Sequence, residues 1–138
     1  MIGLPSLAAL DGKPGPRIWL AAEATDMRCG FDRLAARVEA VTGESPLSGH
    51  LFVFRSRCGS RLKILAWDRD GFVLYYKRLE AGVFKLPRLL PGTRSMELKA
   101  SELAMLLDGI DLSKLKRTPR YHHPNSAASP HEKVRLVR

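Results

Sequence analysis

Residues 51–55 form a short apolar run that ends in Arg, and apolar and basic residues alternate along residues 61–67 and again from residue 72 onward. Alternation with a period of two is typical of β-strands that present one face to a core. Cys-Gly-Ser separates the first two stretches and Asp-Arg-Asp-Gly the last two, and both sequences favour tight turns. The pattern predicts an antiparallel meander with strands at 51–55, 61–67, 72–78 and 83–86, and shorter strands at 17–21 and 96–98.

A different periodicity marks residues 26–42, where apolar residues recur at intervals of three and four. This spacing places an apolar stripe along one side of a helix. Thr25 precedes the stripe as a candidate N-cap, and Gly43 follows it as a candidate C-terminal stop. A second, shorter helix is predicted at 101–108. The stripe of the main helix consists of Met27, Phe31, Leu34, Val38 and Val41.

The chain has 138 residues, which is room for one ordinary domain. The predicted elements indicate an α+β fold in which a meandering, mainly antiparallel sheet packs against the main helix. We expect this domain to span residues 17–113. Residues 1–16 are expected to form a loose N-terminal arm. Residues 114–138 are rich in Lys, Arg, Pro, His and Ser and are expected to form a flexible, disordered basic tail.

Turn lengths predict how the strands pair and which side chains share a face. An odd-length loop between the first two strands places Arg55 opposite Arg61, and a two-residue turn at 70–71 places Trp67 opposite Leu74. One face of the sheet is then almost entirely apolar and meets the core. The other, mixed face is predicted to contain Arg55, Arg57, Arg61, Lys63 and Arg78 beside Trp67 and Tyr76.

This mixed face is the candidate nucleic-acid-binding site of the folded domain. Cations interleaved with aromatic rings suit nucleic acid, because phosphates pair with the cations and bases stack on the rings. The competing interpretation is that the aromatic residues pack in the core while the arginines border a solvated edge. Burial preference favours core packing for Trp67. For Arg55, Arg57 and Arg61 both interpretations stay open.

The formal net charge is +9, and it is unevenly distributed. Residues 112–138 hold seven basic residues and one acidic residue, whereas residues 1–111 hold 16 basic and 13 acidic residues. A basic segment suits a polyanion, since each Lys or Arg that neutralises a phosphate releases counterions. The competing interpretation is a tail that only aids solubility. The candidate nucleic-acid-binding residues therefore also include Lys114, Lys116, Arg117 and Arg120.

No residue pattern indicates a catalytic or metal site. Asp68 and Asp70 lie two positions apart, but Asp before Gly is turn chemistry and no third ligand is apparent. Tyr75 and Tyr76 lack the surrounding His and Arg residues that would activate a nucleophilic tyrosine. The His pair at 122–123 falls in the expected tail, where its geometry is not preorganised. We expect a non-enzyme without catalytic residues, metal or other cofactor.

Two further features concern the cellular compartment. Cys29 and Cys58 lie in no CxxC or Cys/His cluster, so free thiols are expected rather than a disulfide or a zinc site. No apolar stretch is long enough to cross a membrane, and the first residues lack the basic start of a signal peptide. The sequence thus predicts a cytoplasmic protein that does not contact a membrane.

Five segments match one known family in sequence and in order: RIWLA at 17–21, TDMRCGFDRL at 25–34, GHLFVFRSRCGSRLKILAWDRDG at 49–71, FVLYYKRLEAGVF at 72–84 and LLDGI at 106–110. Together they resemble TnpB, the accessory protein encoded by the second reading frame of insertion sequences of the IS sixty-six class. Two departures are visible. Residues 7–15 look like an insertion or an unusual start, and this chain has Cys29 and Arg33 where many members have a basic residue and Gly.

The resemblance implies a role in DNA transposition beside a separate transposase that supplies the catalytic carboxylates, and it brings no catalytic residue to this chain. We expect a non-catalytic accessory protein of a bacterial insertion sequence that binds DNA within the transposition complex. Its expected partners are DNA, the transposase and another accessory protein of the same element. The alternative is a protein–protein adaptor that does not contact DNA. A nuclease using Asp68 and Asp70 is a disfavoured third interpretation.

Overall fold

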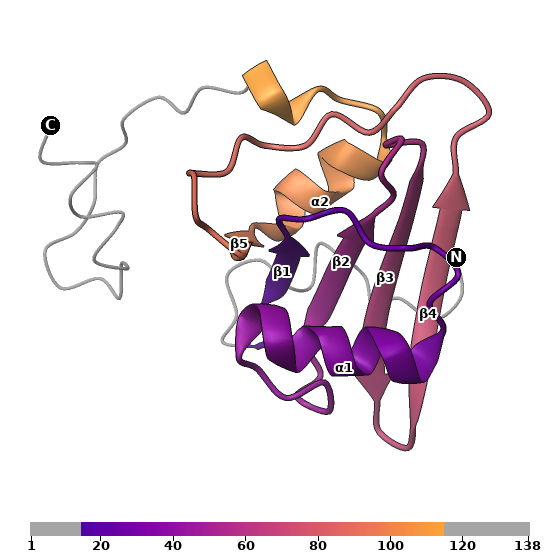
Figure 1. The fold of residues 1–138 in the computed structure, drawn as a ribbon, viewed down its shortest axis with the longest axis vertical. Coiled ribbons are helices and arrows are strands. Elements are labelled where there is room, and N and C mark those ends of the chain that lie inside the picture. The colour runs from indigo at the N-terminus through magenta and orange to yellow at the C-terminus, as the bar shows by residue number, and fades with distance from the viewer. Residues whose placement is uncertain (1–14, 115–138) are drawn as a thin grey trace, which may run out of the picture.

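The computed structural model describes residues 15–114, which form a five-stranded mixed sheet with a helix on each face (Figure 1). The strands are β1 (Ile18–Ala21), β2 (Leu51–Arg55), β3 (Arg61–Asp68), β4 (Gly71–Arg78) and β5 (Ser95–Leu98). Their order across the sheet is β4-β3-β2-β1-β5. All neighbours are antiparallel except β1 and β2, which are parallel. The predicted α+β class with a mainly antiparallel sheet is confirmed. The predicted arm and tail lie outside the described residues, apart from 15–16 and 114.

Both faces of the sheet are buried under helices. The main helix, α1 (Phe31–Thr42), crosses one face from near β4 toward β1, as Figure 1 shows. The second helix, α2 (Ala100–Leu107), packs on the other face and is followed by the single turn η2 (Leu112–Lys114). The α1-side core contains Leu34, Val38, Phe52, Phe54 and Leu65, and the α2-side core contains Ile18, Leu20, Leu51, Val53, Ile64, Leu103 and Leu106.

The main helix begins five residues later than predicted, at Phe31 rather than at residue 26. Its N-cap is Gly30, in an extended conformation without a side-chain cap. The preceding residues form a turn instead, because the Asp26 carboxylate accepts a hydrogen bond from the Arg28 backbone N–H at 2.9 Å. Such Asx hydrogen bonding competes with the helix. The predicted helix end is confirmed, since Gly43 is the C-terminal cap with a positive φ of 73°.

The predicted register of β2 and β3 is wrong by one residue. Arg55 pairs with Leu62 and Phe54 pairs with Lys63, so Arg55 lies on the opposite face from Arg61 and Lys63. The prediction assumed one apolar face and one mixed face. In fact the central part of both strands is buried on both faces, and alternation then no longer distinguishes core from surface.

The β3–β4 turn also differs from the prediction. Asp68 pairs with Gly71, so the two-residue loop is Arg69-Asp70, with Arg69 in the left-handed region at φ 53°. The register is shifted by two residues, so each side chain of β4 stays on its predicted face of the sheet but lies opposite a different residue of β3. Lys63, for example, lies opposite Tyr76. Trp67 is half-buried and packs edge-to-face on Phe72, with ring centroids 5.0 Å apart.

The strand predicted at 83–86 is absent from the described structure, where this segment is irregular. Its backbone nevertheless makes specific hydrogen bonds: the Phe84 N–H donates to the Gly59 carbonyl at 2.8 Å, and the Lys85 carbonyl accepts from the Leu112 N–H at 3.0 Å. Phe84 is buried in the α2-side core. The segment thus packs as a covering loop beside the sheet, and its neighbouring prolines suit that role. Within residues 15–114, no helix is long and apolar enough to cross a lipid bilayer.

Candidate nucleic-acid interface

A cleft of about 660 Å³ opens between two loops that follow neighbouring strands. One wall is the loop after β1, and the other is the turn that joins β2 to β3. The two walls are tied together at the base by a backbone hydrogen bond from the Thr25 N–H to the Arg55 carbonyl, at 2.8 Å. The cleft is lined by Ala24, Thr25, Asp26, Met27, Arg28, Ser56, Arg57, Cys58, Ser60 and Arg61.

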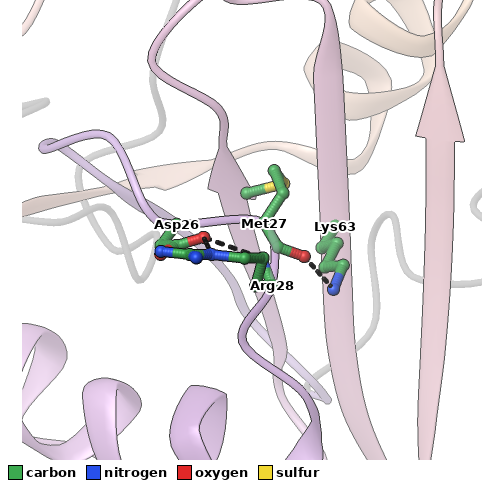
Figure 2. A network of polar contacts seen from close by, with 4 residues as sticks. All are labelled: Asp26, Met27, Arg28 and Lys63. Atoms are coloured by element: carbon green, nitrogen blue, oxygen red, sulfur yellow. Dashed lines mark hydrogen bonds and ion pairs between the residues drawn. The ribbon is translucent and has the colours of Figure 1, made fainter.

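Arg28 is held at the first wall by its neighbour Asp26 (Figure 2). The guanidinium donates through Nε at 3.1 Å and through Nη2 at 2.7 Å to the Asp26 carboxylate. These hydrogen bonds lower the pKa of Asp26 to about 2, so the ion pair persists at neutral pH. The Arg28 side chain is 90% exposed, and its Nη1 has no hydrogen-bond partner among residues 15–114. Arg28 therefore has a fixed position and a remaining donor group.

Lys63 supports this wall from inside the sheet. Its Nζ donates to the Met27 carbonyl at 2.7 Å and to the Cys29 carbonyl at 2.8 Å, and it lies 4.7 Å from the ring centroid of Tyr76. Figure 2 shows the Met27 carbonyl directed at Lys63 on β3. Lys63 is only 6% exposed. It was predicted as a nucleic-acid contact, but the structure places it beneath the surface, where it positions the turn that carries Arg28.

The second wall carries Arg57 and Arg61 on a turn with a well-defined conformation. Ser56 closes the turn, since its N–H donates to the Arg61 carbonyl at 2.9 Å and its Oγ accepts from the Arg61 N–H at 3.1 Å. Gly59 has a φ of +82°, and a Cβ there would lie 3.3 Å from the Cβ of Val83. The positive φ strongly favours glycine, and a side chain there would also crowd Val83. The turn therefore presents its arginines from a rigid base.

The exposed guanidinium groups of the second wall make almost no hydrogen bonds within residues 15–114. Arg57 makes no hydrogen bond or ion pair within the described part of the chain, and Arg61 has a single long contact, Nη1 to the Tyr76 hydroxyl at 3.4 Å. Together with Arg28 they form a group of three arginines around one cleft that contains a single carboxylate, Asp26. The local charge is thus net positive, and all three side chains are accessible.

The remaining predicted contact residues lie elsewhere. Arg55 projects on the opposite face, where its Nη2 donates to the Ala22 carbonyl at 2.9 Å and fixes the start of the first wall. Arg78, at the end of β4, forms an ion pair with Glu80 at 3.0 Å. Lys114 is exposed at the end of η2. Lys116, Arg117 and Arg120 lie outside the described residues.

Of the ten residues that line the cleft, only Arg57 and Arg61 were predicted from sequence, and Arg28 and Thr25 are among those that were missed. Thr25 is 3% exposed and lines the cleft, and its Oγ1 has no hydrogen-bond partner among residues 15–114. A buried hydroxyl without a partner is costly, and this oxygen is sealed beneath the surface of the cleft. The available signal was the segment TDMRCGFDRL, which contains both residues and carried part of the family resemblance. Because this segment was predicted to be the start of the main helix, however, neither Arg28 nor Thr25 was predicted to belong to a binding site.

Cys58 lies between the arginines of the second wall and is an exposed free thiol. Hydrogen bonds with the hydroxyls of Ser56 (3.5 Å) and Ser60 (3.1 Å) lower its pKa to about 7. A lowered pKa enlarges the thiolate fraction at neutral pH, and the thiolate is the reactive form. Cys29, in contrast, is buried in the α1-side core.

We expect iodoacetamide to alkylate Cys58 selectively, with a rate that reaches half its maximum near pH 7. Mass spectrometry of the native protein over pH 5.5–9 measures the rate at each cysteine. Ser60→Ala, which removes the shorter hydrogen bond, should move the midpoint upward, toward the value of about 8.5 for an ordinary thiol. Equal labelling of Cys29 and Cys58, or a midpoint unaffected by Ser60→Ala, would contradict this account of the thiol.

Comparison with known proteins gives the chain a family. The model of the family described as IS66 Orf2 like protein matches residues 16–117. Two Sinorhizobium fredii (strain NBRC 101917 / NGR234) proteins, both named as uncharacterized, are similar to it. Protein y4hO is 46% identical over 95 residues, which are 69% of this chain and 81% of the relative. Protein y4jC is 34% identical over 105 residues, which are 76% and 88% of the two chains.

No solved structure matches the chain at a significant level. The family match covers the whole described sheet, both helices and both walls of the cleft. It confirms the resemblance noted in the sequence segments. The chain belongs to the IS66 Orf2-like family, the accessory proteins of insertion-sequence transposition.

Proposed function

We propose that this accessory protein binds DNA, and that the cleft contacts the phosphate backbone. The observation that carries the proposal is the convergence of Arg28, Arg57 and Arg61 on one cleft. Guanidinium groups recognise phosphates through paired N–H donors and remain charged at all physiological pH values. Fixed backbones at both walls hold these donors in place before a ligand arrives.

The size and polarity of the cleft fit a nucleotide unit of a longer strand. Its volume of about 660 Å³ lies in the range of sites for small molecules, roughly 300–1,000 Å³. Ser56 and Ser60 also line the cleft, with their hydroxyls already hydrogen-bonded to the Cys58 sulfur. The lining of the cleft joins the three arginines to a mostly apolar surface, which suits a phosphate that sits beside a sugar or a base. The basic residues from Lys114 onward, including Lys116, Arg117 and Arg120, would add contacts without sequence preference.

The proposed role is non-catalytic, with cleavage and joining of DNA left to the transposase in the bacterial cytoplasm. Among residues 15–114 no group of three or more His, Cys, Asp or Glu side chains is arranged to hold a metal ion. Asp68 lies at the end of β3 and Asp70 in the β3–β4 turn, and neither lines the cleft. The arrangement therefore supports binding and positioning of DNA better than hydrolysis.

A salt titration tests the proposal and separates it from the adaptor alternative. The full chain should bind a fluorescent duplex with an affinity that falls steeply with salt. Three phosphates neutralised at the cleft, at about 0.9 per phosphate, require a log–log slope of about −3 or steeper. Fluorescence anisotropy between 50 and 300 mM salt measures the slope. Absence of binding at 50 mM salt, together with co-purification of the transposase, would favour an adaptor whose charge meets an acidic protein.

A further inference from the structure

The outer edge of β4 is an unusually long strand edge without a partner in the described sheet. β4 has eight residues and pairs only with β3. The Leu79 N–H, just beyond its end, donates inward to the Ser60 carbonyl. Because inward and outward positions alternate along an antiparallel strand, the backbone groups of residues 72, 74, 76 and 78 point outward. Within residues 15–114, these four residues thus offer N–H and C=O groups without a backbone partner along one line.

The two edges of the sheet differ in how they are protected against pairing with another strand. The opposite edge, β5, has only four residues and contains Glu97, which forms an ion pair with Arg17. β4 has no proline, and its residues 72–76 are Phe-Val-Leu-Tyr-Tyr. Tyr76 is 48% exposed. Natural proteins shield long apolar edges with charges, prolines or short strands, and β4 has none of these along its centre.

We infer that a second copy of this chain pairs with β4, antiparallel and centred on Leu74. In this register Leu74 faces its own counterpart and Phe72 faces Tyr76 of the second copy, both on the α1 side of the sheet. Asp70 then faces Arg78 of the second copy, and the two-fold symmetry repeats this pair. The ends of the strand are therefore complementary in charge only when the strand meets an antiparallel copy of itself.

The pairing is compatible with every contact described for β4. Lys77 keeps its hydrogen bond from Nζ to the Leu107 carbonyl at 3.0 Å, because its backbone groups face inward and its side chain lies on the α2 side. Arg78 has further N–H donors for Asp70 beside its exposed ion pair with Glu80. The product is a continuous ten-stranded sheet with the α1 helices of both copies on one face. This inference stands independently of DNA binding.

Charge reversal tests the inference on the full chain in the absence of DNA. Sedimentation equilibrium from 1 to 200 µM should show a monomer–dimer equilibrium. Asp70→Arg, in an exposed turn, should raise the dimer dissociation constant about tenfold or more, since two like-charge pairs replace two attractive ones. The double variant Asp70→Arg, Arg78→Asp restores opposite charges and should return the constant to within about threefold of wild type.

Glu97→Arg makes the same charge change at the opposite edge and is the matched control. It should leave the dimer unchanged. A monomer throughout the concentration range would overturn the inference. A dimer that is insensitive to Asp70→Arg, or that the double variant does not restore, would place the contact elsewhere and overturn it equally. Circular dichroism melts of each variant confirm that the monomer fold is intact.

Discussion

Replacing Arg28, Arg57 and Arg61 together with alanine is expected to weaken binding of duplex DNA by about 100-fold at 100 mM salt. Each arginine lost removes a charge-assisted contact to a phosphate that contributes about 1 kcal/mol, so the three together contribute about 3 kcal/mol, or a factor of about 100. The log–log salt slope should become shallower by about 2–3, since three phosphates lose their cation. Anisotropy titrations at two salt concentrations, with terminal DNA of the element and with random DNA, measure both quantities.

The matched control removes three exposed arginines that do not line the cleft, Arg17, Arg88 and Arg94. It changes the net charge equally, so an equal loss of affinity would mean that the cleft has no special part in binding. Deletion of 115–138 provides the other comparison. It should weaken binding to both DNAs alike, whereas the cleft variant should also reduce the preference for terminal DNA. If the deletion alone abolishes that preference, the assignment of specificity to the cleft is wrong.

Lys63→Met is expected to lower the free energy of unfolding by about 2–4 kcal/mol, because two carbonyls lose their hydrogen-bond donor in a mostly buried site. The unbranched methionine keeps the packing of the lysine stem, so most of the loss comes from Met27 O and Cys29 O. For a domain of this size, the melting temperature should fall by about 10–20 °C. Thermal melts and urea unfolding, both followed by circular dichroism, measure the change.

The exposed Lys85 is the control for this substitution, since its side chain makes no hydrogen bond within residues 15–114. Lys85→Met should change stability by less than about 0.5 kcal/mol. Lys63→Met should also weaken DNA binding in buffer cold enough to keep the variant folded, because the turn that carries Arg28 loses its support. A variant as stable as wild type would show that the hydrogen bonds of Nζ do not hold this turn.

Local chemistry made much of the fold predictable from sequence. The strands at 51–55 and 61–67, the second helix and the end of the main helix at Gly43 each follow from short-range periodicity or a single glycine. The strand register was not predictable in this way. Both faces of β2 are buried, so apolar residues occupy successive positions and their pattern does not indicate which side chains face α1 and which face α2.

The candidate site was predictable only in part, because its geometry depends on contacts between distant segments. Arg57 and Arg61 were identified from a basic turn that the sequence displays directly. Lys63 looked like a surface cation because its acceptors, the Met27 and Cys29 carbonyls, lie 36 and 34 residues away. Arg28 was missed because its segment was interpreted as helix, and part of what holds its turn, the Lys63 ammonium, comes from a strand far away in the sequence.

The parallel pairing of β1 with β2 has a consequence for how this fold can diversify. The loops that follow these two strands form the two walls of the cleft, which is where open sheets with parallel strands commonly place their ligands. Apart from Arg61 at the start of β3, every lining residue belongs to one of these loops. The two strands fix where the walls of the cleft lie, and the loops supply the side chains that line it. Substitutions in these two short loops can therefore change what the cleft is able to bind in a relative while both hydrophobic cores stay the same.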